Sequence, residues 1–318
     1  MRTYHDCIPC FARQALDAAR RVTADPAVHE HVLRATLRQA ADMPFDRPPP
    51  WMGRQIHRLL RELTGDPDPY RQDKRRSNEL ALSLLPSLKQ QVADSADPFG
   101  TAVRLAIAGN IIDLGTRSHI PDDEVRASIN TAVRGPLDEI TLRDLRRAAR
   151  AAETILYLAD NAGEIVFDRL LIEELPLPRV TLAVRGHPVI NDATAEDAAA
   201  AGLANLVTVV DNGSDAPGTL LETCSPDFRE RFQRADLVIA KGQGNYETLS
   251  DAGREVFFLL RVKCPVIARD LGCDVGRPAI RRCGAPGDQK TTNPPPGRFD
   301  GRLPTVSTSG GDGQGDRQ

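Results

Sequence analysis

The sequence predicts an α/β protein in which an N-terminal all-helical cap domain precedes an open, doubly wound, mostly parallel sheet of the Rossmann-like type. Two observations support this prediction. Apolar residues recur at helical spacing through the first 150 residues, where no convincing strand is found, whereas residues 151–283 alternate short apolar runs with helical segments. Strands that alternate with helices favour parallel pairing and a sheet covered on both faces.

The first expected helix runs from about residue 8 to residue 22, with its apolar side chains three and four positions apart. Asp6 is a suitable N-cap, and Pro9 falls in the first turn, where its missing N–H costs nothing. A second helix is expected at about 28–40, before a Pro48-Pro49-Pro50 run that cannot continue a helix. Further helical patterns cover about 51–64, 72–92, 99–112, 122–134 and 141–152.

Five short apolar runs are the expected strands of the second half, at residues 154–158, 180–184, 206–210, 237–240 and 265–268. We therefore expect a helical cap domain at 1–150, an α/β metal- and phosphate-binding domain at 151–283, and a tail at 284–318. The tail contains 8 Gly and 5 Pro among its 35 residues. We expect it to be disordered, because it cannot bury enough apolar surface.

The composition is that of a globular protein, with 41% hydrophobic and 27% charged residues. A net charge of -3 argues against a general nucleic-acid binder, whose affinity comes from a basic surface. No apolar run approaches the length of about 18 residues that a membrane span needs, and the N-terminus lacks the apolar stretch of a secretion signal. Six scattered cysteines do not form a disulfide framework, so we expect a cytoplasmic protein.

Polar residues follow each of the first four expected strands directly. In an open parallel sheet these strand ends lie on one edge, where ligands bind in the crevice outside the carboxyl ends. We therefore expect four separate loops to converge on one site. They are Asp160-Asn161, Arg185-Gly186-His187-Pro188, Asp211-Asn212-Gly213 and Lys241-Gly242-Gln243-Gly244-Asn245-Tyr246-Glu247.

Oxygen ligands in two of these loops predict a metal site. Asp160 and Asn161 offer the hard oxygen atoms that magnesium or manganese prefers, and Asp192 offers another carboxylate after the second strand. Gly163 and Glu164 add a close backbone approach and a further carboxylate. The alternative is that Asp160 and Asp192 only cap the helices that follow them. We favour metal binding by Asp160, Asn161 and Asp192.

Two cations at strand ends predict that the ligand is a phosphate. Arg185 and Lys241 would be costly to bury without an anionic partner, and arginine forms a bidentate fork with phosphate whereas lysine provides a point charge. Lys241 could instead be a surface lysine. Gly242, Gly244 and Asn245 favour a loop whose backbone N–H groups face the ligand, although its spacing matches neither a Walker A loop nor a Rossmann fingerprint.

Two motifs in the helical half can each be interpreted in two ways. Asn110 and Asp113 are one helical turn apart, so they either point into the same crevice or lie on a solvated helix face. Cys7 and Cys10 stand at a helix start, where thiol pKa values fall, and either redox chemistry or plain packing would explain them. A zinc site would need two more ligands, and no second cysteine pair of this spacing exists.

Together these motifs resemble the damage-control phosphatase family, also catalogued as domain of unknown function eighty-nine. The resemblance covers about residues 4–280, and the cysteine pair resembles the stand-alone prokaryotic branch. The matching stretches are Cys7-Ile8-Pro9-Cys10, Gly109-Asn110-Ile111-Ile112-Asp113, Asp160-Asn161-Ala162-Gly163-Glu164, Arg185-Gly186-His187-Pro188-Val189-Ile190-Asn191-Asp192-Ala193-Thr194 and Lys241-Gly242-Gln243-Gly244-Asn245-Tyr246-Glu247.

The resemblance implies a helical cap over an α/β sheet, and hydrolysis of sugar phosphates or related small phosphorylated metabolites with manganese, nickel, cobalt or magnesium. By the family pattern, Asp160, Asn161 and Asp192 hold the metal and Lys241 binds the substrate phosphate. We expect Arg185 to assist Lys241, and Glu164 to orient an attacking water unless Asp160 itself is the nucleophile. The alternatives are a non-catalytic metal- or metabolite-binding module and an S-adenosylmethionine-dependent carboxyl methyltransferase.

Overall fold

Six strands form one sheet in the order β3-β2-β1-β4-β5-β6. The computed structural model describes residues 1–284 except 111–126, 128 and 132. The first five strands are parallel, β6 runs antiparallel to β5, and the strand order reverses beside β1. The predicted α/β class with a mostly parallel sheet is confirmed. The strands are β1 (Ile155–Leu158), β2 (Val180–Val184), β3 (Thr208–Asp211), β4 (Leu237–Lys241), β5 (Val256–Arg261) and β6 (Pro278–Cys283).

The strand predicted at residues 265–268 is wrong. This stretch begins helix α13 (Pro265–Leu271), in which Pro265 takes the first turn and Gly272 ends the helix with a φ of 68°. The fifth strand is β5 instead, whose first five residues are all buried. The sequence pattern also missed β6, because this antiparallel edge strand has no continuous apolar run.

Helices occupy the first half, and none of its described residues lies in a strand, as predicted. Asp6 precedes the first helix, but its side chain makes no capping hydrogen bond there and pairs with Arg269 instead. Most of the helix predicted at 122–134 lies outside the described residues. The helices are α1 (Cys7–Val22), α2 (Pro26–Asp42), α3 (Pro49–Thr64), α4 (Arg71–Ala93), α5 (Pro98–Ala108) and α8 (Glu139–Ala151).

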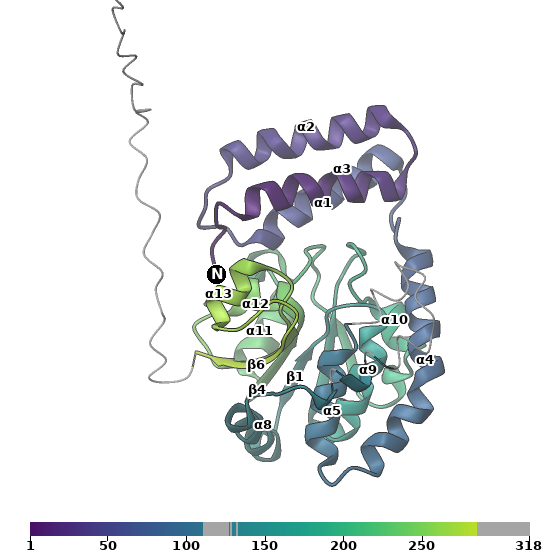
Figure 1. The fold of residues 1–318 in the computed structure, drawn as a ribbon, viewed down its shortest axis with the longest axis vertical. Helices are drawn as coiled ribbons and strands as arrows, with labels where there is room; N and C mark the ends of the chain where they lie inside the picture. Colours follow the sequence, from purple (N-terminus) through teal and green to yellow (C-terminus); the bar gives the residue numbers. More distant parts are fainter. Residues whose placement is uncertain (111–126, 128, 132, 285–318) are drawn as a thin grey trace, which may run out of the picture. The chain divides into compact units, whose positions relative to one another are not determined.

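Alternate side chains of the strands face two different helical layers. One face packs with α4, α5, α8, α9 (Glu164–Glu173) and α10 (Ala195–Ala200). The other packs with α11 (Pro226–Arg234), α12 (Gly242–Leu249) and α13. Helices α1, α2 and α3 lie side by side in Figure 1 and share a third apolar core. Short 3-10 helices are η1 (Leu177–Arg179), η2 (Leu203–Asn205) and η3 (Leu221–Thr223).

Residues Met1–Asp288 form one compact unit, in which α4 and α5 belong to the layer that covers the sheet. The predicted domain boundaries at residues 150 and 283 stay predictions. The predicted disordered tail lies outside the described residues, apart from its first residue. Within the described part of the chain, no helix is both long and apolar enough to cross a membrane.

Candidate active site

The loops that follow β1 and β2 are joined by backbone hydrogen bonds at the carboxyl edge of the sheet. Asn161 and Asp192 pair as an isolated antiparallel bridge. The Ala193 N–H donates to the Asp160 carbonyl oxygen at 2.8 Å, and the Ala162 N–H donates to the carbonyl oxygen of the residue before Asp192, also at 2.8 Å. These bonds bring the three predicted metal-binding residues together, although Asp192 lies more than thirty positions after Asp160 and Asn161 in the chain.

The side chains of these residues contact one another and Arg185. The Asn161 Nδ2 donates to Asp160 Oδ2 at 2.7 Å and to Glu164 Oε2 at 3.0 Å. Arg185 donates through Nε to Asp192 Oδ2 at 2.7 Å, and its Nη2 lies 3.7 Å from Asp160 Oδ1. All five side chains are buried. The structure therefore gathers into one cluster the residues predicted from two strand ends.

Negative charge is concentrated in this cluster. Burial, together with the charges of Glu164 and Asp192, raises the pKa of Asp160 to about 8. Burial also raises the pKa of Asp192, although Arg185 and the Gly218 N–H act in the opposite direction. Carboxylates buried side by side with one guanidinium are an environment that a divalent cation would stabilise.

Two backbone positions with positive φ shape the loops around the cluster. Gly242, directly after β4, has a φ of 79°, and a Cβ placed there would lie 1.9 Å from Asp160 Oδ2. Only glycine leaves room for the carboxylate at this point. Ile190 has a φ of 46°, which is strained for a β-branched residue, and it lies two positions before Asp192.

Lys241 is fully buried and all three of its N–H donors are engaged by protein groups. Its Nζ donates to the Ala106 carbonyl oxygen at 2.9 Å, to Glu164 Oε1 at 2.8 Å, and to Asp168 Oδ1. Burial alone would raise the pKa of Glu164, but Lys241, together with the Asn161 hydrogen bond and the charge of Lys263, outweighs burial, and the pKa is lowered. Lys241 thus keeps Glu164 ionised, and the predicted contact with a substrate phosphate would require it to leave these partners.

Sequence reasoning missed two charged residues of this region. Asp168 lies one turn after Glu164 on α9, is fully buried, and also accepts from the Tyr157 hydroxyl at 2.9 Å. Lys263 is exposed just beyond the carboxyl end of β5, and its charge lowers the pKa values of Asp160 and Glu164. A fifth strand at 265–268 leaves Lys263 before the strand, whereas the observed strand at 256–261 puts Lys263 at the carboxyl edge of the sheet.

Among the remaining predicted residues, Asn110 joins the cluster by donating from Nδ2 to Glu164 Oε2 at 3.1 Å. Asp113 lies outside the described residues. Asn245 is buried and donates to the carbonyl oxygens of Ala159 and Lys241 at 3.1 and 2.8 Å, so its amide holds the β1 and β4 ends together.

The loop predicted around Gly242, Gly244 and Asn245 is wrong: these residues form the start of α12, and Gly244 packs against the 217–218 loop. A Cβ added at Gly244 would lie 3.1 Å from the Pro217 carbonyl oxygen, and one added at Gly218 would lie 2.4 Å from the Gly244 carbonyl oxygen. Gly244 is therefore needed for close approach of the 217–218 backbone. Its predicted contact with substrate, like that of Gly242, stays a prediction.

Of the cysteine pair at the start of α1, only Cys7 lies in the helical core, and Cys10 is half-buried. Cys7 is buried among α1, α2 and α3, and this burial raises the pKa of its thiol to about 11. Cys10 accepts a hydrogen bond from Gln14 Nε2 at 3.1 Å. Packing therefore accounts for Cys7, which has the raised pKa of a structural thiol.

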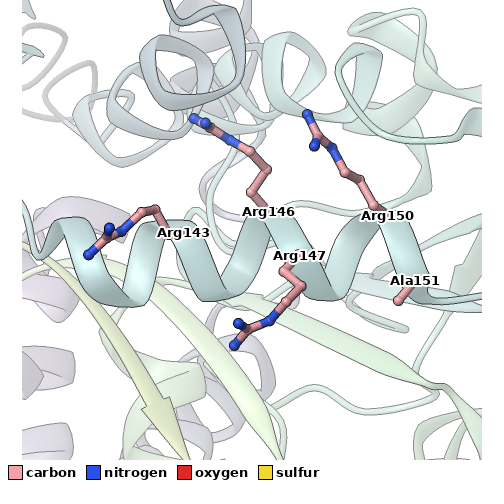
Figure 2. A pocket seen from close by; sticks show the side chains of 5 residues that line it. All are labelled: Arg143, Arg146, Arg147, Arg150 and Ala151. Carbon is pink, nitrogen blue, oxygen red and sulfur yellow. The ribbon is translucent and has the colours of Figure 1, made fainter.

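A separate surface hollow of about 340 Å³ lies along α8 (Figure 2). Two arginines of the hollow pair with carboxylates: Arg146 contacts Asp97 at 2.6 Å and Arg147 contacts Asp144 at 2.5 Å. None of the predicted site residues lines this hollow, so the candidate active site is the cluster at the sheet edge. The hollow is lined by Arg143, Arg146, Arg147, Arg150 and Ala151.

Comparison with known proteins identifies the family. The model of the damage-control phosphatase ARMT1-like domain matches residues 3–278. The chain belongs to this family. The resemblance stated from the motifs is confirmed, and the match includes every predicted site residue.

Relatives of similar length are found in archaea. A damage-control phosphatase of Archaeoglobus fulgidus is 36% identical over 277 residues, which cover 85% of this chain and 95% of the relative. A damage-control phosphatase of Pyrococcus horikoshii is 35% identical over 277 residues, covering 85% and 94%. The crystal structure of a DUF89 family protein from Pyrococcus horikoshii aligns with a TM-score of 0.80 and 32% identity, over 89% of this chain and 99% of that one.

Proposed function

We propose that this member of the ARMT1-like family is a divalent-metal-dependent phosphatase that hydrolyses small phosphorylated metabolites. The observation that carries the proposal is the meeting of Asp160, Asn161 and Asp192, buried beside Arg185 at the carboxyl edge of the sheet. Two relatives named damage-control phosphatases, each about as long as the matched region, support the same reaction class.

The donor chemistry of the cluster fits a hard cation. Asp160 and Asp192 supply carboxylate oxygens, and both hydrogen bonds of Asn161 within the cluster use Nδ2 rather than the carbonyl oxygen that a cation would bind. Within the described part of the chain, no three His, Cys, Asp or Glu side chains form a metal-holding group. The Asn161 amide is therefore the third protein ligand in our proposal, and Gly242 leaves room for the Asp160 carboxylate.

When bound, manganese, nickel, cobalt or magnesium would draw charge from a phosphoryl oxygen and lower the pKa of a coordinated water. The cations of the chain supply the remaining stabilisation of charge. Arg185 reaches both metal-binding carboxylates, and Lys263 is an exposed ammonium on the same edge. Because Lys241 is engaged by Glu164 and Asp168, we assign the phosphate contact to Lys263 and regard Lys241 as a positioning residue.

Glu164 is the group that orients the attacking water in this proposal. Its carboxylate is held ionised by Lys241 and is anchored by the Asn161 and Asn110 amides, all within 3.1 Å. An ionised carboxylate one hydrogen bond away from a metal ligand can accept a proton from water. Asp160, by contrast, is occupied as a ligand, which disfavours it as a nucleophile.

The test is phosphate release from a panel of sugar phosphates and nucleotides with each of the four metals and with a chelator. We expect release only with metal, and a loss of about 10²-fold or more in Asp160→Asn and Asp192→Asn. Lys263→Ala should raise KM more than it lowers kcat. Asp144→Asn, which removes a surface carboxylate on α8, is the control.

Three outcomes would overturn the proposal. Undiminished turnover by Asp160→Asn, or by the wild-type protein in chelator, would remove the metal from the reaction. Tight binding of phosphorylated metabolites without any release of phosphate would favour a non-catalytic binding module. Binding of labelled S-adenosylmethionine with transfer of its methyl group to a carboxylate would favour the methyltransferase.

A further inference from the structure

Three arginines on one face of α3 share a single carboxylate. Arg54, Arg58 and Arg61 are spaced four and three residues apart, so they project from the same side of the helix. Arg54 Nε donates to Asp215 Oδ1 at 2.5 Å, and Arg58 donates through Nε and Nη2 to both carboxylate oxygens. Arg61 Nη2 donates to Asp215 Oδ2 at 2.7 Å. We call these three residues the arginine triad.

The charge of the triad exceeds that of its partner. Each oxygen of Asp215 already accepts two hydrogen bonds, which is the capacity of a carboxylate. Each guanidinium has five N–H donors, yet within the described chain the triad makes five such bonds in all, four to Asp215 and one to Pro188. Two positive charges and most of the donors thus remain for another anion.

The triad is also only partly open to water. The side chains of Arg54 and Arg61 are 16% and 19% exposed, whereas that of Arg58 is 44% exposed. Excess positive charge that is largely shielded from solvent is costly unless an anion accompanies it. An arginine cluster with free planar donors matches the geometry of a phosphate.

Two loops link the triad to the proposed metal site. Arg61 Nη1 donates to the Pro188 carbonyl oxygen at 2.9 Å, four residues before Asp192. Asp215 lies three residues before Gly218, whose N–H bonds to Asp192. Three residues span at most about 11 Å when extended. One small metabolite can therefore reach from the metal-binding carboxylates to the triad.

We propose that the arginine triad is a second anion subsite, which binds a further phosphoryl group of the substrate while the first lies at the metal. This inference rests on the proposed phosphatase function and narrows its substrates to metabolites with two phosphoryl groups. The competing explanation is a structural clamp, in which the triad only fastens α3 to the loop of Asp215. Gly53 of α3 already packs closely on that loop, with Pro217 Cγ 2.8 Å from the position of an added Cβ.

The test compares Arg58→Ala with the matched control Arg75→Ala. Arg58 is the most exposed member of the triad, so its removal least disturbs folding, and Arg75 is a surface arginine that pairs with Glu196 at 3.0 Å. The measurement is kcat/KM for fructose 1,6-bisphosphate and for fructose 6-phosphate. We expect Arg58→Ala to lower the bisphosphate-to-monophosphate ratio about 10-fold, the loss of one charge-assisted hydrogen bond, and Arg75→Ala to leave the ratio as in the wild type.

If Arg58→Ala leaves the bisphosphate-to-monophosphate ratio unchanged, whether both substrates are affected equally or neither is affected, the second subsite is overturned and the clamp is supported. A second arm needs no turnover. Inorganic pyrophosphate is titrated into metal-free protein at low salt, and its binding should weaken about 10-fold in Arg58→Ala but not in Arg75→Ala. If no substrate releases phosphate, the proposed function fails, but the pyrophosphate titration still tests whether the triad binds an anion. Equal pyrophosphate affinity in Arg58→Ala and Arg75→Ala would reject the subsite.

Discussion

The most direct test of the site geometry is the substitution of Gly242 by alanine. Gly242 has a φ of 79° and lies directly after β4, and its missing side chain leaves room for the carboxylate of Asp160. An added Cβ would stand 1.9 Å from Asp160 Oδ2, whereas real Cβ contacts essentially never fall below 3.0 Å. The carboxylate would therefore have to move by about 1.1 Å or more, the difference between these two distances.

Two separate costs follow from this substitution. A non-glycine residue with positive φ costs roughly 1 kcal/mol in unfolding free energy. A displacement of about 1 Å in a catalytic group can lower the rate by about 10²-fold, because the reacting geometry is lost. The loss of unfolding free energy is expected wherever a glycine with positive φ is replaced, but the loss of rate depends on the displacement of the Asp160 carboxylate.

Gly253 separates the two costs. It has a φ of 72°, and a Cβ placed there would meet no atom within 4 Å. We expect Gly242→Ala to lose at least as much stability as Gly253→Ala in urea unfolding, and only Gly242→Ala to lose phosphate release and metal affinity. Wild-type turnover by Gly242→Ala would refute the placement of Asp160 at the reacting centre, and an equal loss in Gly253→Ala would attribute the effect to backbone strain alone.

Two further predictions concern buried charges. Lys241→Met leaves Glu164 and Asp168 without their cation, and we expect urea unfolding to show a loss of about 3–5 kcal/mol; an unchanged midpoint would contradict the ion network. Burial acts to raise the pKa of Asp215, but the hydrogen bonds and charges of Arg58 and Arg54 outweigh burial and lower this pKa from 3.8 to about 2. The ionised Asp215 therefore contributes at most about 2 kcal/mol to the free energy of unfolding. This contribution is present above pH 3.8 and is lost as the pH falls through about 2. The difference in unfolding free energy between the wild type and Asp215→Asn, measured by urea unfolding, should therefore narrow in acid.

The sequence by itself determined the sheet class and most of the site's location. Strands β1 and β4 could be recognised because their residues are buried on both faces of a parallel sheet and read as continuous apolar runs. Their ends could be assigned to one edge by topology alone, which placed Asp160, Asn161 and Lys241 together before any coordinates. A short apolar run is ambiguous between helix and strand, and for this reason residues 265–268 were misassigned and Lys263 was missed.

Only the tertiary structure decided which partner each charged residue has. Nothing in the chain near Lys241 indicates that Glu164 and Asp168 neutralise it, because that contact depends on α9 packing against the sheet. The spacing of Arg54 and Arg58 shows that they share a helix face, but their convergence on Asp215 joins segments more than 150 residues apart. Strand position is a local property of the sequence, whereas the environment of a buried charge is set by segments that meet only in the folded chain.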